Sequence, residues 1–246
     1  MIRTLFAVTV LALYAVVVGL PLLLLAWITD RIGAFYPATV LGLRMALAIA
    51  GVRVRLEDEE NIPSGPCLFM PNHTSAVDPV TVFVMIPRRI AFMAKKELFR
   101  MPFIGWAMQK AGFIPVDRSS REAAAASADV AVEQLRAGAS MVIYPEGTRS
   151  PDARLLPFKR GGFLMAIRGG RPVVPMTITG AESVLPKGEM WIRPGEIRLR
   201  FHPAIDVSGY QEAGREALLQ RVREAIAGGL GEELRGNGAG IGEGEG

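Results

Sequence analysis

The chain has 246 residues, 50% hydrophobic and 21% charged, which suits one globular domain with short additional segments. Its formal net charge of +4 suits an anionic partner such as lipid headgroups, a phosphorylated substrate or nucleic acid. A single cysteine, Cys67, excludes an intramolecular disulfide, and we expect a buried core thiol in a domain that lies in a reducing compartment.

The chain begins with an uncharged stretch between Arg3 and Asp30, long enough to span a hydrocarbon core of ~30 Å. We expect a membrane segment here, because a secretory signal has a shorter apolar region. Pro21, with Gly19 before it, is expected to kink or split the helix, since proline removes a hydrogen bond and clashes with the preceding turn. A second apolar segment follows, and its central Arg44 would cost ~2.5 kcal/mol or more in a spanning helix.

Three membrane arrangements fit these two segments: a hairpin that crosses twice, a re-entrant or interfacial pair, and one span followed by a core helix. A soluble helical hairpin is the fourth alternative. The first two leave the positive charges at both ends of the pair on the same, cytoplasmic side. We favour an embedded pair over residues 1–50, with the re-entrant form ahead of the spanning one because of Pro21 and Arg44.

From residue 51 onward, short β-like runs alternate with helical stretches. The predicted strands are 52–56, 66–70, 90–94, 112–116, 140–144, 172–179 and 197–202. The predicted helices are 79–85, a broken stretch over 96–111, 119–138, 161–168 and 214–226. Ser119 and Glu122 are expected to form a capping box. This alternation predicts an α/β domain over 51–235, with a central, largely parallel sheet flanked by helices, and a disordered glycine-rich tail over 236–246.

Three polar clusters each begin where a predicted strand ends: residues 72–78, 117–118 and 145–150. Ligands bind outside the carboxyl ends of the strands in open α/β sheets, so we expect the three clusters to share one cleft. The side chains that this reasoning selects are His73, Asp78, Arg118, Glu146 and Arg149.

His73 and Asp78 are the candidate acid–base pair. Taken alone, Asp78 before Pro79 is a natural helix N-cap. The same carboxylate can also receive the His73 ring N–H, which would set the tautomer and stabilise the imidazolium formed when His73 takes a proton. The alternative is a metal-dependent hydrolase, in which the only other histidine, His202, would join His73 and Asp78 at one metal ion.

Basic side chains provide two further signals. A guanidinium donates two parallel hydrogen bonds to phosphate, so Arg118 and Arg149 together with Lys159 could hold one phosphate group. A second basic stretch is either a solvated face or a surface that seats the domain on anionic headgroups or a polyanionic acyl carrier. Its members are Arg88, Arg89, Lys95, Lys96, Arg100 and Lys110.

Taken in order, these clusters resemble the glycerolipid acyltransferase family, most closely its lysophosphatidic acid acyltransferases. The matching stretches are Asn72-His73-x-x-x-x-Asp78, 112–118 ending at Arg118, 144–150, 158–162 and 173–176. Two residues depart from the usual pattern: Thr74 stands where many of these enzymes have glutamine, and Tyr144 where phenylalanine is usual.

The resemblance implies a membrane-bound enzyme of phospholipid biosynthesis. His73, oriented by Asp78, would activate the sn-2 hydroxyl of lysophosphatidic acid for attack on an acyl thioester, which gives phosphatidic acid. Three side chains would bind the acceptor phosphate: Arg118, Arg149 and Lys159. Three residues would position the acceptor: Glu146, Gly147 and Thr148. Val174 and Pro175 would border the acyl region.

The resemblance also implies that no metal or other cofactor takes part, that acyl-CoA or acyl carrier protein is the donor, and that nucleic acid is not a partner. The expected location is the inner membrane, with the catalytic domain on its cytoplasmic face. Another lysolipid as acceptor, either a lysophospholipid or a lyso-ornithine lipid, stays open as an alternative. A non-enzymatic binder of anionic lipid or nucleic acid is the remaining alternative.

Overall fold

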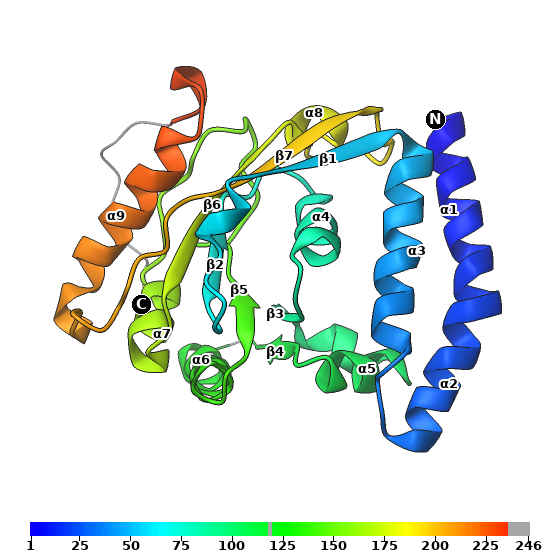
Figure 1. Ribbon diagram of the computed structural model, residues 1–246, viewed down its shortest axis with the longest axis horizontal. Helices are drawn as coiled ribbons and strands as arrows, with labels where there is room; N and C mark the ends of the chain where they lie inside the picture. Colours follow the sequence, from blue (N-terminus) through cyan, green and yellow to red (C-terminus); the bar gives the residue numbers. More distant parts are fainter. Residues whose placement is uncertain (118–119, 236–246) are drawn as a thin grey trace.

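A computed structural model describes residues 1–117 and 120–235. In this part of the chain seven strands form one sheet, in the order β1-β7-β6-β2-β5-β3-β4 (Figure 1). Their bounds are Val52–Glu57 (β1), Leu68–Pro71 (β2), Ile90–Lys95 (β3), Ile114–Val116 (β4), Ser140–Val142 (β5), Val173–Thr179 (β6) and Gly195–Phe201 (β7). Neighbouring strands are parallel except β6 and β7. The predicted, largely parallel sheet is therefore confirmed.

Helices cover both faces of the sheet (Figure 1). Their bounds are Asp78–Met85 (α4), Ile104–Lys110 (α5), Arg121–Arg136 (α6), Gly161–Gly169 (α7), Ala181–Val184 (α8) and Arg215–Gly228 (α9). Short 3₁₀ turns lie at Glu59–Asn61 (η2), Lys96–Arg100 (η3), Glu212–Gly214 (η4) and Glu232–Leu234 (η5).

The central strand β2 explains why the predicted strands read as continuous apolar runs. Its Leu68 and Met70 pack into the core under α6, α7 and α9, whereas Cys67 and Phe69 pack into the opposite core with α4 and α8. Successive side chains point to opposite faces, and both faces are covered, so the whole run is buried. The expected buried thiol at Cys67 is confirmed, and burial raises its pKa to about 11.

The N-terminal segment forms one continuous helix, so the predicted split into two pieces is wrong. It comprises α1 (Ile2–Tyr14), a π-helical turn over Ala15–Gly19 and α2 (Leu20–Thr29). In the π turn, the Leu20 N–H bonds to the Ala15 carbonyl five residues back. Pro21 has no N–H to offer and its ring crowds the preceding turn, and the wider turn accommodates it without a break.

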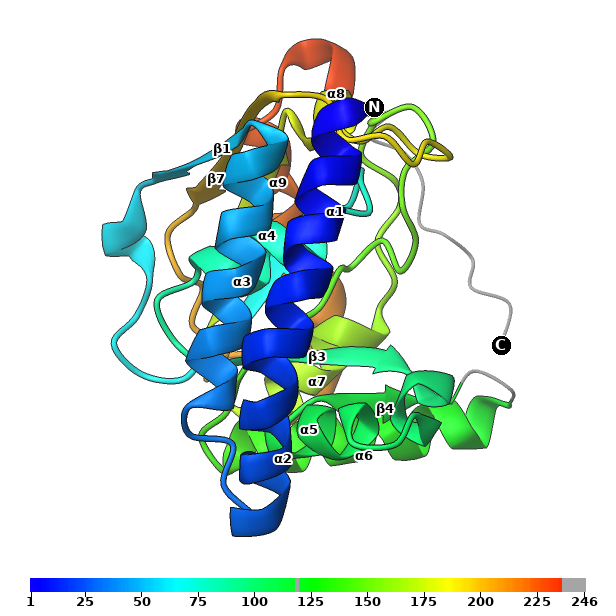
Figure 2. The same cartoon turned by 90° about the vertical axis from the view of Figure 1, so that its right-hand side faces the viewer.

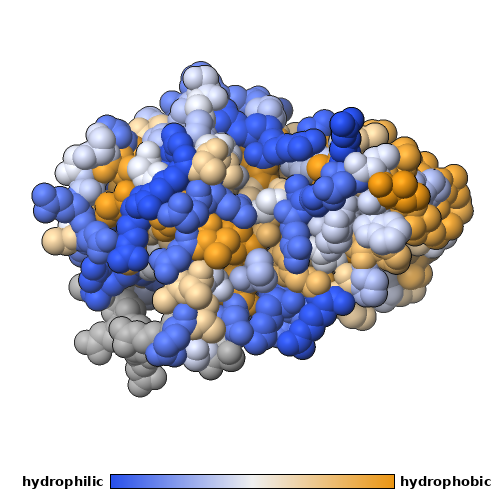
Figure 3. Space-filling view, turned by 90° about the horizontal axis from the view of Figure 1, so that it is seen from below, coloured by the Kyte–Doolittle hydropathy of each residue, from blue (hydrophilic) through white to orange (hydrophobic). Residues whose placement is uncertain are grey.

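The helix α3 (Phe35–Ala50) lies beside α1 and α2 (Figures 1 and 2). The Tyr14 hydroxyl donates to the Ala38 carbonyl at 2.9 Å, and its ring packs over Gly42, where a Cβ would come within 2.6 Å of the ring. The helix 2–29 is long and apolar enough to cross a membrane, and little of it is buried. Apolar surface gathers at this end of the molecule (Figure 3).

Arg44 does not face the apolar surroundings that its sequence position suggested. Its Nε and Nη2 donate to the Val84 carbonyl at 2.8 and 2.5 Å, near the C-terminus of α4. The last carbonyls of a helix have no partner within the helix, and a cation there is also favoured by the helix dipole. The arginine in this apolar helix therefore ties α3 to α4.

Two predicted helix starts are also wrong. Ser120, rather than Ser119, caps α6, because its Oγ accepts from the Ala123 N–H at 3.1 Å. Asp78 is the first residue of α4, and Val77 occupies the cap position without a side-chain bond. Ser119, Arg118 and the tail 236–246 lie outside the described residues.

Candidate active site

The loop that carries His73 starts at the end of β2, where Asn72 extends the pairing with β6. The Asn72 side chain donates to the Ile178 carbonyl at 3.0 Å and accepts from the Ile178 N–H at 2.7 Å. A buried amide with both ends bonded to backbone has a single orientation. Asn72 therefore fixes the direction in which the chain leaves the sheet towards His73.

The structure brings His73 and Asp78 into contact, as the sequence predicted. Asp78 is fully buried, and its Oδ2 contacts the His73 Nδ1 at 2.9 Å and accepts from the Thr74 and Ser75 N–H groups, both at 2.8 Å. The carboxylate thus holds the 73–78 loop instead of capping α4, which corrects the expected capping role. Because Nδ1 carries the proton shared with Asp78, Nε2 is the free basic atom, and His73 lines a cleft.

Glu146 supports the same loop from the turn after β5. Its side chain is 2% exposed, Oε1 accepts from the His73 N–H at 2.6 Å and Oε2 accepts from the Leu156 N–H at 2.9 Å. Burial raises the pKa of the Glu146 carboxyl to about 7. The hydrogen bonds from the two backbone N–H groups lower this pKa, but by less than burial raises it. The Ser150 N–H also donates to the His73 carbonyl at 2.8 Å. Both Glu146 oxygens bond to backbone, whereas the sequence predicted that this residue positions the acceptor.

Tyr144 packs on the ring of His73. Its ring and that of His73 are stacked, with centroids 4.1 Å apart and planes inclined by 27°. Its hydroxyl is buried and has no hydrogen-bond partner among the described residues. Burial raises the pKa of this phenol well above its usual value, and the nearby Asp78 carboxylate raises it further. The phenol therefore stays protonated, and Tyr144 holds the imidazole plane by contact.

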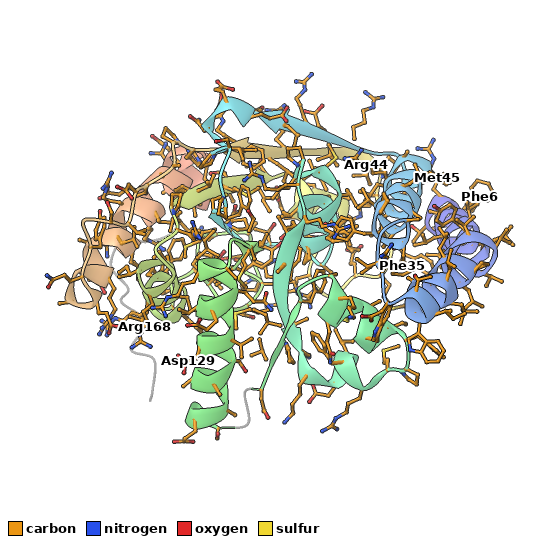
Figure 4. All side chains as sticks on the ribbon, turned by 60° about the horizontal axis from the view of Figure 1, so that its bottom comes forward. Phe6, Phe35, Arg44, Met45, Asp129 and Arg168 are labelled. Atoms are coloured by element: carbon orange, nitrogen blue, oxygen red, sulfur yellow. The ribbon has the colours of Figure 1, made fainter. Side chains whose placement is uncertain are left out.

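The cleft in front of His73 has a volume of about 1230 Å³ and mostly apolar walls. It runs from Phe35 on α3 to Asp129 on α6 and Arg168 on α7, which Figure 4 shows on opposite sides of the molecule. Its size exceeds the ~300–1,000 Å³ of common small-molecule sites, so it can hold a long apolar ligand.

Cationic side chains line the part of the cleft near His73. These side chains are Arg149 and Lys159, which the sequence predicted to share the cleft with His73. Gly147 and Thr148 also line the cleft. Gly147 has a φ of 69°, and a Cβ there would lie 2.9 Å from the Lys159 Cδ, so the glycine allows the lysine to cross the turn.

The site prediction missed Lys95, which lines the cleft from the end of β3. The strand-end rule that selected the other clusters could have found it. Its neighbour Lys96 instead pairs with Asp117 at 2.5 Å.

Val174 and Pro175 do not line the cleft; both are buried within β6 in the middle of the sheet. His202 is also elsewhere, with its Nε2 bonded to the Thr177 Oγ1 at 2.7 Å, and burial lowers its pKa. Within residues 1–117 and 120–235, no group of three or more His, Cys, Asp or Glu side chains is arranged to hold a metal ion.

Residues 53–179 match the model of the acyltransferase family. This chain belongs to that family. A 1-acyl-sn-glycerol-3-phosphate acyltransferase of Borreliella burgdorferi is 30% identical over 185 residues, which are 75% of this chain and 74% of that protein. The chloroplastic 1-acyl-sn-glycerol-3-phosphate acyltransferase BAT2 of Brassica napus is 34% identical over 182 residues, which are 73% of this chain and 48% of the BAT2 protein.

The crystal structure of the 1-acyl-sn-glycerophosphate (LPA) acyltransferase PlsC from Thermotoga maritima superposes with a TM-score of 0.79 and 27% identity, and covers 97% of both chains. This acyltransferase spans about half the length of the plant chloroplast relatives that it matches. The resemblance drawn from the sequence motifs is confirmed.

Proposed function

We propose that this chain is a 1-acyl-sn-glycerol-3-phosphate O-acyltransferase of phospholipid biosynthesis. It transfers a fatty acyl group from an acyl thioester to the sn-2 hydroxyl of lysophosphatidic acid and so forms phosphatidic acid. The observation that carries this proposal is the His73–Asp78 pair, which opens on a large apolar cleft that also contains Arg149 and Lys159. The names of the relatives support the same acceptor.

In the proposed reaction, His73 Nε2 takes the proton of the acceptor hydroxyl while that oxygen attacks the thioester carbonyl. The tetrahedral intermediate then expels the thiolate, which takes the proton from the His73 imidazolium. Asp78 stabilises the imidazolium through the 2.9 Å contact at Nδ1. A positioned base of this kind contributes ~10²–10⁴ in rate.

Arg149 and Lys159 bind the acceptor phosphate in this proposal, with Arg118 as the third predicted ligand and Lys95 as an addition from the cleft lining. The donor's acyl chain occupies the apolar part of the cleft between α3, α4 and α5, rather than the region of Val174 and Pro175. The donor is acyl-CoA or an acyl carrier protein. The N-terminal helices embed in the inner membrane, with the catalytic domain on the cytoplasmic face.

Changing each histidine in turn tests the proposal. His73→Ala should reduce acyl transfer to lysophosphatidic acid to below about a tenth of wild-type turnover, because the base is lost. His202→Ala is the matched control, since it changes the only other histidine, and should retain activity. Substantial turnover by His73→Ala would refute the assigned base. Loss of activity in His202→Ala and after chelation would favour the metal-dependent hydrolase.

The acceptor is tested by offering purified wild-type enzyme several lysolipids with one labelled acyl donor. We expect lysophosphatidic acid to be preferred, because a terminal phosphate can receive hydrogen bonds from both Arg149 and Lys159. A preference for lysophosphatidylcholine or a lyso-ornithine lipid would overturn the acceptor and leave the family assignment intact.

A further inference from the structure

The segment between β3 and β4 exposes apolar side chains outside the N-terminal helices. Four of them follow one another closely along η3 and α5: Leu98, Met101, Phe103 and Ile104, each 39% to 45% exposed. Single exposed apolar residues are ordinary, but a contiguous group on one segment marks a surface that contacts protein or lipid.

This group continues the apolar surface of α2. The rings of Phe103 and Trp27 meet edge to face with centroids 5.5 Å apart, and Trp27 is itself exposed. The Lys110 Nζ pairs with Asp30 Oδ1, just after α2, at 2.6 Å. Figures 1 and 2 both show α5 beside α2. The two elements therefore present one continuous surface.

The backbone holds Phe103 outward at a conformational cost. Its φ of 61° is rare for a residue with a bulky side chain, and such strain persists only where the surroundings impose it. The next turn is tight, because a Cβ on Gly105 would lie 2.1 Å from the Phe99 carbonyl oxygen. Gly105 therefore permits the close turn that presents Met101 and Phe103 to the exterior.

The charges on the segment favour an anionic lipid surface over a neutral protein partner. Residues 95–110 contain four basic side chains and one acidic side chain, a net charge of +3, and two of the four basic side chains, Lys96 and Lys110, pair with Asp117 and Asp30. Apolar side chains beside lysine and arginine are the composition of elements that lie in the headgroup layer. Each such cation near an anionic surface contributes ~1 kcal/mol.

The inner side of the same segment is a wall of the cleft, where Leu98, Ile104, Ala107 and Met108 line the space that leads to His73. We propose that η3 and α5 form a second lipid-surface contact beside α2, so that this wall of the cleft rests on the bilayer and lysolipid reaches His73 without crossing water. The inference rests on the proposed membrane-bound acyltransferase function.

Fluorescent labelling of the full chain tests the contact directly. Cys67 is fully buried, so a cysteine introduced at the surface can be labelled selectively with an environment-sensitive dye. Met101→Cys is the test site, Ile28→Cys on α2 the membrane reference, and Val130→Cys on α6 the matched exposed apolar control. The probe surface is a vesicle of phosphatidylcholine with a minority of phosphatidylglycerol.

We expect the dye at positions 28 and 101 to shift to the blue and to be quenched by lipid-attached quenchers, while the dye at 130 stays as in water. If the dye at position 101 emits as in water while the dye at position 28 shifts to the blue, the second contact alone is overturned. A water-like dye at all three positions would overturn the second contact and membrane attachment together.

Activity provides an independent test with charged substitutions. Met101→Glu/Phe103→Glu should lower kcat/KM for vesicle-borne lysolipid on the order of ten-fold, whereas Val130→Glu should leave it unchanged. With the same lysolipid dispersed in detergent, all variants should match the wild type, because neither Met101 nor Phe103 lines the cleft. Equal activity of the double variant on vesicles would contradict the contact. Inactivity of the wild type on both forms would instead refute the proposed function.

Discussion

Asp78 receives three hydrogen bonds at one carboxylate oxygen, so its position and its charge have separate consequences. The two bonds from the Thr74 and Ser75 N–H groups fix the loop, and the third orients His73. An amide oxygen in the same place can still accept these bonds, but it carries no charge to stabilise the imidazolium.

Asp78→Asn should therefore keep the fold and lower kcat by ~10²–10⁴, because only the charge is lost. Steady-state kinetics with lysophosphatidic acid measure this effect, and the thermal midpoint checks the fold. Asp206→Asn, at an exposed loop position, is the control and should change neither value. A kcat within a few-fold of wild type would argue against a charged partner for His73.

The stacked Tyr144 separates packing from hydrogen bonding. Its buried hydroxyl has no partner among the described residues, so Tyr144→Phe should retain turnover within about three-fold and lose no more than ~1 kcal/mol of stability. Tyr144→Ala removes the ring and should destabilise the fold by ~3 kcal/mol or more, as large-to-small changes do. Kinetics and chemical denaturation of the two variants make the comparison. A large loss of kcat in Tyr144→Phe would show that the hydroxyl acts on substrate.

Glu146 makes stability depend on pH. Its pKa of about 7 in the folded protein lies above the ordinary value of 4.5, so the folded state binds the proton more tightly than the unfolded chain does. The stabilisation is therefore complete below about pH 4.5 and is lost as pH rises through 7. This difference in pKa corresponds to ~3 kcal/mol.

Glu146→Gln should remove this pH-dependent stabilisation. Between pH 4.5 and 8 the free energy of unfolding of the wild type should therefore fall by ~3 kcal/mol relative to that of the variant. Chemical denaturation in detergent at several pH values measures it. Glu182→Gln, at a partly exposed position on α8, provides the control. Parallel pH profiles for wild type and Glu146→Gln would contradict the raised pKa.

At the scale of single elements, the sequence predicted strands better than helix ends. Runs such as Leu68–Pro71 are buried on both faces and read as continuous apolar stretches, which local pattern alone reveals. Helix starts depend on which of several adjacent polar residues reaches a backbone N–H. Ser120 caps α6 although Ser119 has the better spacing to Glu122. The π turn before Pro21 could not be predicted, because a proline indicates that the regular hydrogen bonding of a helix is disturbed but not which local geometry replaces it.

Arg44 is the clearest case in which a tertiary contact reversed a local interpretation. Within α3 it argued against a spanning helix, yet its partner, the Val84 carbonyl, lies 40 positions away in sequence. Arg44→Met should cost ~1.5–3 kcal/mol, since two hydrogen bonds from a charged group to a helix terminus are lost. The thermal midpoint in detergent measures this loss, and Arg31→Met, at an exposed position, should have almost no effect. Equal midpoints for both variants would contradict the tie between α3 and α4.

At the scale of the whole molecule, the candidate site was predictable because it lies at the carboxyl ends of neighbouring parallel strands. The loops after β2 and β5 and the last residue of β3 bring His73, Arg149 and Lys95 to the same cleft. Pro175, which the motif suggested as a border of the acyl region, lies inside the sheet and does not line the cleft. Apolar side chains of α3, α4 and α5 line one part of the cleft, and only the fold brings these helices together.

The apolar part of the cleft should therefore set the length of the donor's acyl chain. Ala107 on α5 lines it, and Ala107→Phe adds a ring to the space between α3 and α5. Each methylene that no longer fits costs a long chain ~1 kcal/mol or more, so the preference should shift towards shorter donors by about ten-fold. A competition assay with one long-chain and one short-chain thioester measures the ratio of products. Ala137→Phe, exposed just after α6, is the control and should keep the wild-type ratio. If Ala107→Phe slowed both donors equally, the chain would have to occupy the arm of the cleft between α6 and α7.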